Sequence, residues 1–159
     1  MRRHKLWLDG KWLEGTDHEV REIRSPFDGE VVARADYASA DQMERAIAAS
    51  VAAFTHYRRS SRFARARLLE AMRDGIAARK ADLARVIALE AGKPITIAEG
   101  EVLRALTTFT VAAEEAKRVG GDVIPIDIDA TGRPYSEAVS YWVPRGPILG
   151  ITPFNFPVN

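Results

Sequence analysis

The segment with the clearest capacity for chemistry is Pro153-Phe154-Asn155-Phe156-Pro157, where one amide lies between two aromatic residues and two prolines. Proline fixes φ, so Pro153 and Pro157 restrict this backbone to few shapes. An asparagine held rigidly among apolar groups can direct its N–H donors at an oxygen that becomes negative during a reaction. Asn155 is therefore a candidate oxyanion donor. Asparagine also caps helices and closes turns, and from composition alone that structural role is the more frequent one.

The other polar residues form no comparable pattern. The three histidines, His4, His18 and His56, lie far apart, with no carboxylate or second histidine at helical spacing, so we predict neither catalysis nor metal binding by them. The sequence contains neither G-x-G-x-x-G nor G-x-x-x-x-G-K-[ST], and a phosphate-binding loop of these types is therefore not expected.

Two charged groups are predicted to be solvated rather than functional. The first is a set of carboxylates that lack the convergent pairing needed for acid–base work: Glu99, Glu101, Glu114 and Glu115. The second is the basic run of residues 58–67, which has few interleaved aromatics and is expected to pair with local acidic residues. A phosphate contact by this run is the minor alternative.

Composition narrows the class of protein. The chain has 159 residues, 47% of them hydrophobic, which is the size and make-up of one ordinary domain. It has no cysteine, so these residues provide no disulfide, no thiolate metal site and no cysteine nucleophile. The formal net charge of +1 and the absence of a long apolar stretch favour no nucleic acid and no membrane partner. Residues 1–5 are basic but are followed by Trp7-Leu8-Asp9-Gly10 rather than a signal sequence, so we expect a cytoplasmic protein.

The first part of the chain predicts short strands followed by helices. Residues 5–8 and 11–13 flank Asp9-Gly10, a strong hairpin signal, and a turn at residues 25–29 precedes a strand at 30–33. Ser39-Ala40-Asp41-Gln42 has the form of a capping box, which predicts that a helix begins there. Its apolar stripe is expected to belong to the core: Met43, Ile47, Val51 and Phe54. Further helices are predicted at about 61–79, from about 80 to a stop at Gly92-Lys93-Pro94, and from there to Gly120-Gly121.

Beyond Gly121 the hydrophobic pattern changes to that of strands. Residues 123–128 and 135–143 predict a hairpin with no cleanly polar face, which suggests that another subunit covers it. Residues 148–151 are apolar throughout, as in a buried parallel strand. Ligands gather at the carboxyl ends of such strands, and Asn155 follows this one directly. The fold class is therefore α/β.

The segment 151–157 resembles the signature stretch of the NAD(P)-dependent aldehyde dehydrogenase superfamily, which reads I-x-P-[WF]-N-F-P. Further similarities follow in family order along essentially the whole chain: Asp9-Gly10-Lys11-Trp12, residues 25–29, Ala52-Ala53-Phe54, residues 90–94 and residues 144–148. Thr152 together with Phe154 is similar to the lactaldehyde and non-phosphorylating glyceraldehyde-3-phosphate branch of the family.

The resemblance implies a fold, a division of the chain and an activity. Residues 1–121 would be the strands and helices of the cofactor-binding domain, 122–143 the oligomerisation β-hairpin of a homo-dimer or homo-tetramer, and 144–159 the first strand of the Rossmann sheet with its Pro-Phe-Asn-Phe-Pro motif. The catalytic domain would lie outside the chain, so the fold would be incomplete. In this family a cysteine thiolate attacks an aldehyde, hydride passes from the thiohemiacetal to NAD or NADP, and a glutamate activates water to hydrolyse the thioester.

The resemblance also implies roles for individual residues. Asn155 matches the asparagine that stabilises the thiohemiacetal oxygen, and Phe156 matches an aromatic residue of the aldehyde tunnel. The residues expected to line the cofactor cleft are Ile151, Thr152, Pro153 and Phe154. The family's nucleophilic cysteine, its general-base glutamate and its ribose- and phosphate-binding residues have no counterpart in this chain. We therefore expect an amino-terminal piece of a dehydrogenase that is inactive alone.

Two alternatives remain at this stage. A non-catalytic truncated paralogue would use the 122–143 hairpin as an interaction module. A free-standing helical protein would use its basic run to bind nucleic acid, but this leaves the terminal Pro-Phe-Asn-Phe-Pro stretch unexplained.

Overall fold

The computed structural model describes residues 2–17 and 19–159, so His18 and its predicted lack of function lie outside the described residues. The amino-terminal part forms a three-stranded sheet of order β1 (Arg2–His4), β5 (Val31–Asp36) and β4 (Val20–Arg24). β1 runs parallel to β5, and β4 runs antiparallel to it. A separate antiparallel hairpin joins β2 (Leu6–Leu8) to β3 (Lys11–Leu13).

The Asp9-Gly10 turn is confirmed, with φ of 50° and 75° at its two residues. Positive φ at both positions matches the right-handed twist of the flanking strands, which is why this dipeptide connects hairpins. Sequence analysis missed β1 and β4, because their residues are mostly charged and their short strands are held by backbone pairing rather than by an apolar face.

A part-buried ion pair connects β1 to β5 in this sheet. The Arg3 guanidinium donates from Nε to Asp36 Oδ1 at 2.8 Å, and the Asp36 side chain is fully enclosed. This hydrogen bond holds the pKa of Asp36 below its ordinary value. The resulting stabilisation is present above the unfolded-state pKa of about 4 and is lost as the pH falls through the lower folded-state value.

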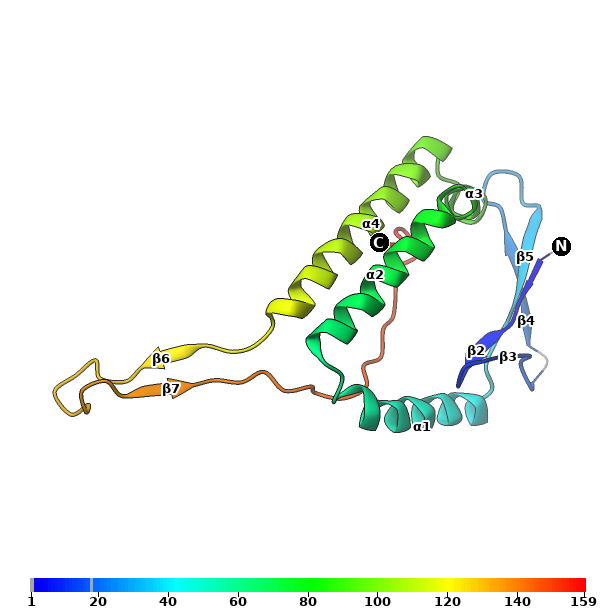
Figure 1. Ribbon diagram of the computed structural model, residues 1–159. Coiled ribbons are helices and arrows are strands. Elements are labelled where there is room, and N and C mark those ends of the chain that lie inside the picture. The colour runs from blue at the N-terminus through cyan, green and yellow to red at the C-terminus, as the bar shows by residue number, and fades with distance from the viewer. Residues whose placement is uncertain (1, 18) are drawn as a thin grey trace.

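Four helices follow, at the positions that the sequence predicts: α1 (Ala40–Tyr57), α2 (Arg62–Ala78), α3 (Lys80–Ala91) and α4 (Ile95–Arg118). α2 and α4 lie side by side, and α3 crosses between their ends (Figure 1). The core of this three-helix unit is built of small and β-branched residues: Ala84, Ile87, Ala98 and Val102. No helix in the described parts of the chain is both long and apolar enough to cross a membrane.

α1 is set apart from the other helices. Ser39 forms the predicted capping box with Gln42, and Gln42 also binds the Glu14 carbonyl at 2.8 Å. The prediction that the apolar stripe of α1 belongs to the core is wrong, because Met43, Ile47 and Val51 are each 51% exposed. Figure 1 shows the reason: α1 runs along the base of an open frame and does not pack along α2 or α4.

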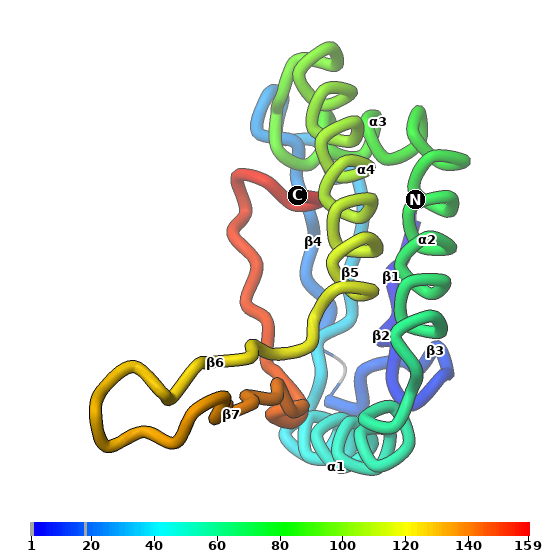
Figure 2. Tube along the Cα trace, turned by 60° about the vertical axis from the view of Figure 1, so that its left-hand side comes forward, coloured from blue at the N-terminus to red at the C-terminus, as the bar shows by residue number. Residues whose placement is uncertain are grey.

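Residues 120–143 form an arm that projects from the helices (Figure 2). Its strands, β6 (Val123–Pro125) and β7 (Glu137–Val139), are shorter than predicted, although backbone bonds from Trp142 N–H to Gly120 O and from Ile126 N–H to Ser136 O extend the pairing. Beyond Ser136 the Tyr135 N–H donates to the Asp127 carboxylate at 3.1 Å, within the loop that joins the two strands. Both faces of the arm are exposed, consistent with its lack of a polar face.

The stretch 148–151, predicted as a buried strand, is extended but exposed, and no strand pairs with it among the described residues. The prediction that these residues are buried is wrong here, because an apolar strand is buried only where a neighbouring strand and covering elements are present. No described segment of this chain supplies that strand.

Candidate functional site

Residues 152–159 lead back onto the α2–α3–α4 unit and end against α4 (Figure 2). The chain turns at Phe154-Asn155, and Val158 then packs against the helical core. The Val158 backbone N–H donates to Glu101 Oε1 at 3.1 Å. At the last residue, the Asn159 side-chain amide lies 2.7 Å from Thr108 Oγ1. The candidate site is thus held by α4 through both backbone and side-chain contacts.

Glu101 is the central contact of this attachment. The prediction that it faces solvent is wrong, because the residue is only 3% exposed. Glu101 follows Ala98 by three positions and precedes Ala105 by four, which places it on the buried face of α4. Its second carboxylate oxygen forms an ion pair with Lys93, whose side chain is also largely buried.

Phe156 lies beneath two cations. The Lys93 ammonium is 4.3 Å from the centre of the ring, and the Arg104 guanidinium is 5.1 Å from it. Both distances are within the range of a cation–π interaction. Phe156 therefore contacts the helical unit and is not part of the cavity beside Asn155. Its predicted tunnel role stays a prediction.

Asn155 lines a cavity of about 590 Å³ between α3 and the turn that contains Pro26. The walls are mostly apolar and include Ile23, Leu83, Val86 and Ile87. Among the described residues, none hydrogen-bonds the Asn155 side-chain amide, whose donors stay available to a ligand. Asn155 is exposed at the edge of this cavity, and a fixed amide donor beside apolar walls can hydrogen-bond an oxygen that becomes negative.

The residues expected at the cofactor form an exposed strip: Ile151, Thr152, Pro153 and Phe154. Their fit to a nicotinamide cofactor is partial. The apolar side chains Ile151 and Phe154 are open to a flat ring, but the described residues contain no glycine-rich loop that would surround phosphates. These residues could thus supply one wall of a cofactor cleft, while the phosphate contacts would come from elsewhere.

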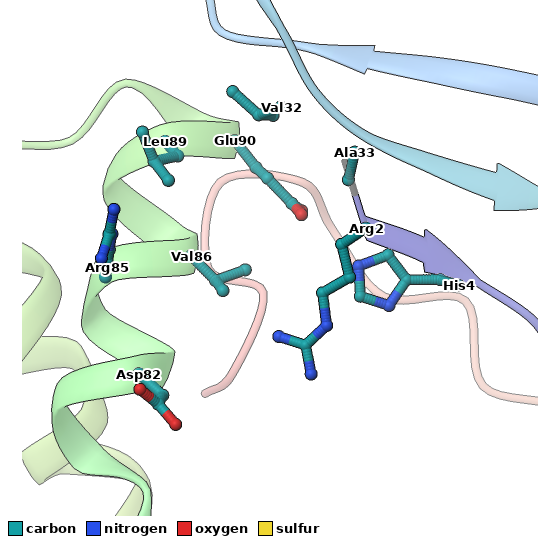
Figure 3. Close-up of a pocket in the computed structure, with 9 residues that line it drawn as sticks. All are labelled: Arg2, His4, Val32, Ala33, Asp82, Arg85, Val86, Leu89 and Glu90. Atoms are coloured by element: carbon teal, nitrogen blue, oxygen red, sulfur yellow. The ribbon is translucent and has the colours of Figure 1, made fainter.

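A second cavity, of about 290 Å³, lies between α3 and the strands β1 and β5 (Figure 3). It adjoins the first cavity, because Val86 and Glu90 line both. Arg2, His4 and Arg85 line it together with the carboxylates Asp82 and Glu90. None of the residues 151–159 reaches it, and its mixed charges do not select one kind of ligand.

In the basic run, Arg67 pairs with Glu70 at 2.7 Å. The pKa of Glu70 is lowered by hydrogen bonds from Lys117 and Arg67, as expected for a solvated face with acidic partners.

The chain has an α/β fold in which strands, a helical unit, a projecting arm and a turn at Asn155 follow one another along the sequence. Residues 12–159 match the model of the aldehyde dehydrogenase family, and the chain belongs to this family. The fold class expected from the sequence is thereby confirmed. The narrower resemblance to the lactaldehyde branch stays a prediction.

Individual relatives agree with this assignment. The mitochondrial succinate-semialdehyde dehydrogenase of Arabidopsis thaliana is 34% identical over 151 residues, which are 95% of this chain and 28% of the relative. Malonate-semialdehyde dehydrogenase 2 of Bacillus mycoides is 35% identical over 97% of this chain and 31% of its own length. Among solved structures, a 3,6-anhydro-L-galactose dehydrogenase superimposes with a TM-score of 0.85 and 26% identity, covering 99% of this chain and 32% of its own. The chain thus spans less than a third of the length of these relatives.

Proposed function

We propose that this chain is the amino-terminal part of an NAD(P)-dependent dehydrogenase that oxidises an aldehyde to a carboxylic acid through a cysteine thiohemiacetal. The observation that supports this most directly is the position of Asn155, beside a mostly apolar cavity with its amide donors free. The cysteine, the general base and the phosphate-binding groups would come from polypeptide beyond these residues. Because the 159 residues contain no cysteine, they would not oxidise aldehydes alone.

In this proposal Asn155 acts by hydrogen bonding. Its Nδ2 group donates to the aldehyde oxygen as that oxygen becomes negative during attack by the thiolate. The nicotinamide, when bound, accepts the hydride. Ile151, Thr152, Pro153 and Phe154 would line the cofactor cleft, and Phe156 would lie at the aldehyde tunnel. NAD and NADP remain equal candidates, since the ribose-binding residues are not among these 159.

The 120–143 arm is proposed to join subunits of a homo-dimer or homo-tetramer. Its side chains are exposed on both faces, including Tyr141, Trp142 and Val143. A large exposed apolar surface on a projecting hairpin is typical of a subunit interface.

The proposed location of the protein is the cytoplasm.

The alternative is a truncated, non-catalytic paralogue that binds a full-length relative through the same arm. The exposed arm is compatible with it, but this alternative gives no role to the free amide of Asn155.

Two substitutions in the aldehyde-oxidising polypeptide test the role of Asn155. Asn155→Ala removes the donor, and kcat should fall by about 10²- to 10³-fold. Asn155→Asp keeps the size and shape but replaces the amide donors with acceptors, so it should lose at least as much. The KM for the cofactor should change little in both. Full kcat in either variant would contradict the oxyanion role.

A further inference from the structure

Glu101 is a buried carboxylate that the proposed chemistry does not use. Burying a charge is unfavourable unless the charge is paired and hydrogen-bonded. Here both oxygens have a partner: one faces the Lys93 ammonium, and the other accepts the Val158 N–H at 3.1 Å. Lys93 lies between α3 and α4, while Val158 lies three residues after Asn155. The carboxylate therefore connects the helical unit to the Asn155 segment.

Lys93 makes a second connection to the same segment. The residue follows Gly92, the C-cap of α3 with φ of 65°, and precedes Pro94, the N-cap of α4. A side chain at Gly92 would come within 2.7 Å of Pro26, so the backbone before Lys93 is closely packed. From this fixed position the ammonium contacts Glu101 and also lies 4.3 Å from the centre of the Phe156 ring.

These contacts act on the residues directly after Asn155. Phe156 is held by its ring, Val158 by its N–H and by packing on the core, and Pro157 between them has a fixed φ. Asn155 itself has no such contact, and its amide stays free. The backbone that carries the donor is thus held on its carboxyl-terminal side, where Lys93 and Glu101 contact Phe156 and Val158.

We propose that Lys93 and Glu101 are positioning residues for Asn155: the ion pair holds residues 156–158 so that the Asn155 amide meets the reacting oxygen. The inference rests on the proposed function of Asn155. A donor displaced by about 1 Å can reduce a rate by on the order of 10²-fold, so the loss of such a support is visible in kcat.

The first test follows backbone amide exchange at Val158 in the 159-residue chain, because the Val158 N–H donates directly to Glu101. Glu101→Ala removes both contacts, and Lys93→Met removes the ammonium but keeps the length of the side chain. In Glu101→Ala the exchange of the Val158 amide should accelerate about tenfold or more, because its charge-assisted bond is lost. In Lys93→Met it should accelerate less, because Glu101 remains as the acceptor. Glu99→Gln, at an exposed position of α4, is the matched control and should leave the exchange unchanged. Unchanged exchange at Val158 in Glu101→Ala would overturn the proposal.

The second test measures kcat and KM in the aldehyde-oxidising polypeptide. Glu101→Ala should lower kcat about tenfold or more, while the KM for the cofactor changes little, because the support affects orientation rather than binding. Glu101→Gln retains an acceptor for the Val158 N–H and should recover part of the loss, which a merely structural defect would not show. If kcat of Glu101→Ala equals that of Glu99→Gln, the positioning role is wrong.

The two proposals can fail separately. If Asn155→Ala keeps full kcat, the oxyanion role fails, whatever the exchange data show. If Asn155→Ala loses activity but Glu101→Ala does not, only the positioning role fails.

Discussion

α4 and α1 carry apolar residues at the same helical spacing, but their surroundings differ. On α4 the stripe consists of Ala98, Val102 and Ala105, which are fully buried. This helix packs against α2 and α3. On α1 the equivalent stripe is half exposed, and Val51 is 51% accessible. An amphipathic pattern therefore shows that a helix has a partner, but it does not show that the partner is within the same 159 residues. This contrast agrees with relatives more than three times as long.

The largest predicted effect is a difference in the free energy of unfolding between substitutions on α4 and on α1. Val102→Asp would bury an unpaired charge and should lower the free energy of unfolding by about 3 kcal/mol or more. Val51→Asp makes the same chemical change at an exposed position and should alter it by about 0.5 kcal/mol or less. Valine and aspartate have similar helix propensities, so burial decides the difference. Urea unfolding of both variants measures it, and equal losses would show that the two environments are alike.

The same two substitutions can be compared in the longer dehydrogenase that we propose. If the remaining polypeptide covers α1, Val51→Asp should there cost far more than in the 159-residue chain. An effect of about 0.5 kcal/mol or less in both settings would contradict a covered α1.

Smaller effects are expected when two glycines are replaced by alanine, and the two replacements should change the stability in opposite directions. Gly92 ends α3 at positive φ and closely approaches Pro26, so Gly92→Ala should destabilise the chain by about 1–2 kcal/mol. Gly75 lies within α2 with open space around it, and Gly75→Ala should stabilise by about 0.5–1 kcal/mol. Thermal unfolding of the two variants gives the signs. A stabilising Gly92→Ala would mean that the connection before Lys93 is not under this constraint.

The smallest effect compares the beginnings of α1 and α2. Ser39 forms a complete capping box and also accepts a hydrogen bond from Thr16 Oγ1, so Ser39→Ala should cost about 1–2 kcal/mol. Ser61 accepts a single, exposed bond from the Ala64 N–H, and Ser61→Ala should cost about 0.5 kcal/mol. Chemical unfolding of both variants ranks them. The reverse order would show that the buried network at Ser39 adds nothing to α1.

The sequence predicted local structure well where short-range chemistry decides it. The Asp9-Gly10 turn, the Ser39 capping box and the Gly92 stop of α3 depend on a few adjacent residues, and all three are present. Burial was predicted less well, because it depends on what lies opposite. Met43 and residues 148–151 have apolar patterns but no partner among the described residues, so they are exposed.

The candidate site shows the same division. The motif around Asn155 was recognised because its composition is unusual, and the resemblance gave it a role that the structure leaves as a proposal. Glu101 and Lys93 were missed, since a single glutamate and a lysine at a helix stop are ordinary in a sequence. The position of Glu101 between Ala98 and Ala105 was the available signal. Its contact with Val158 joins residues 57 positions apart, which no local pattern predicts.

The most direct test of the central claim is made on the protein purified from its natural source. Its intact mass is measured, and the same sample is assayed for NADH or NADPH formation with a panel of short aldehydes. We expect a mass well above the 17.6 kDa of these residues, with aldehyde-dependent activity. A 17.6 kDa chain that oxidises aldehydes without a cysteine would contradict the proposed mechanism, and an inactive chain of that mass would contradict the assignment as part of a working dehydrogenase.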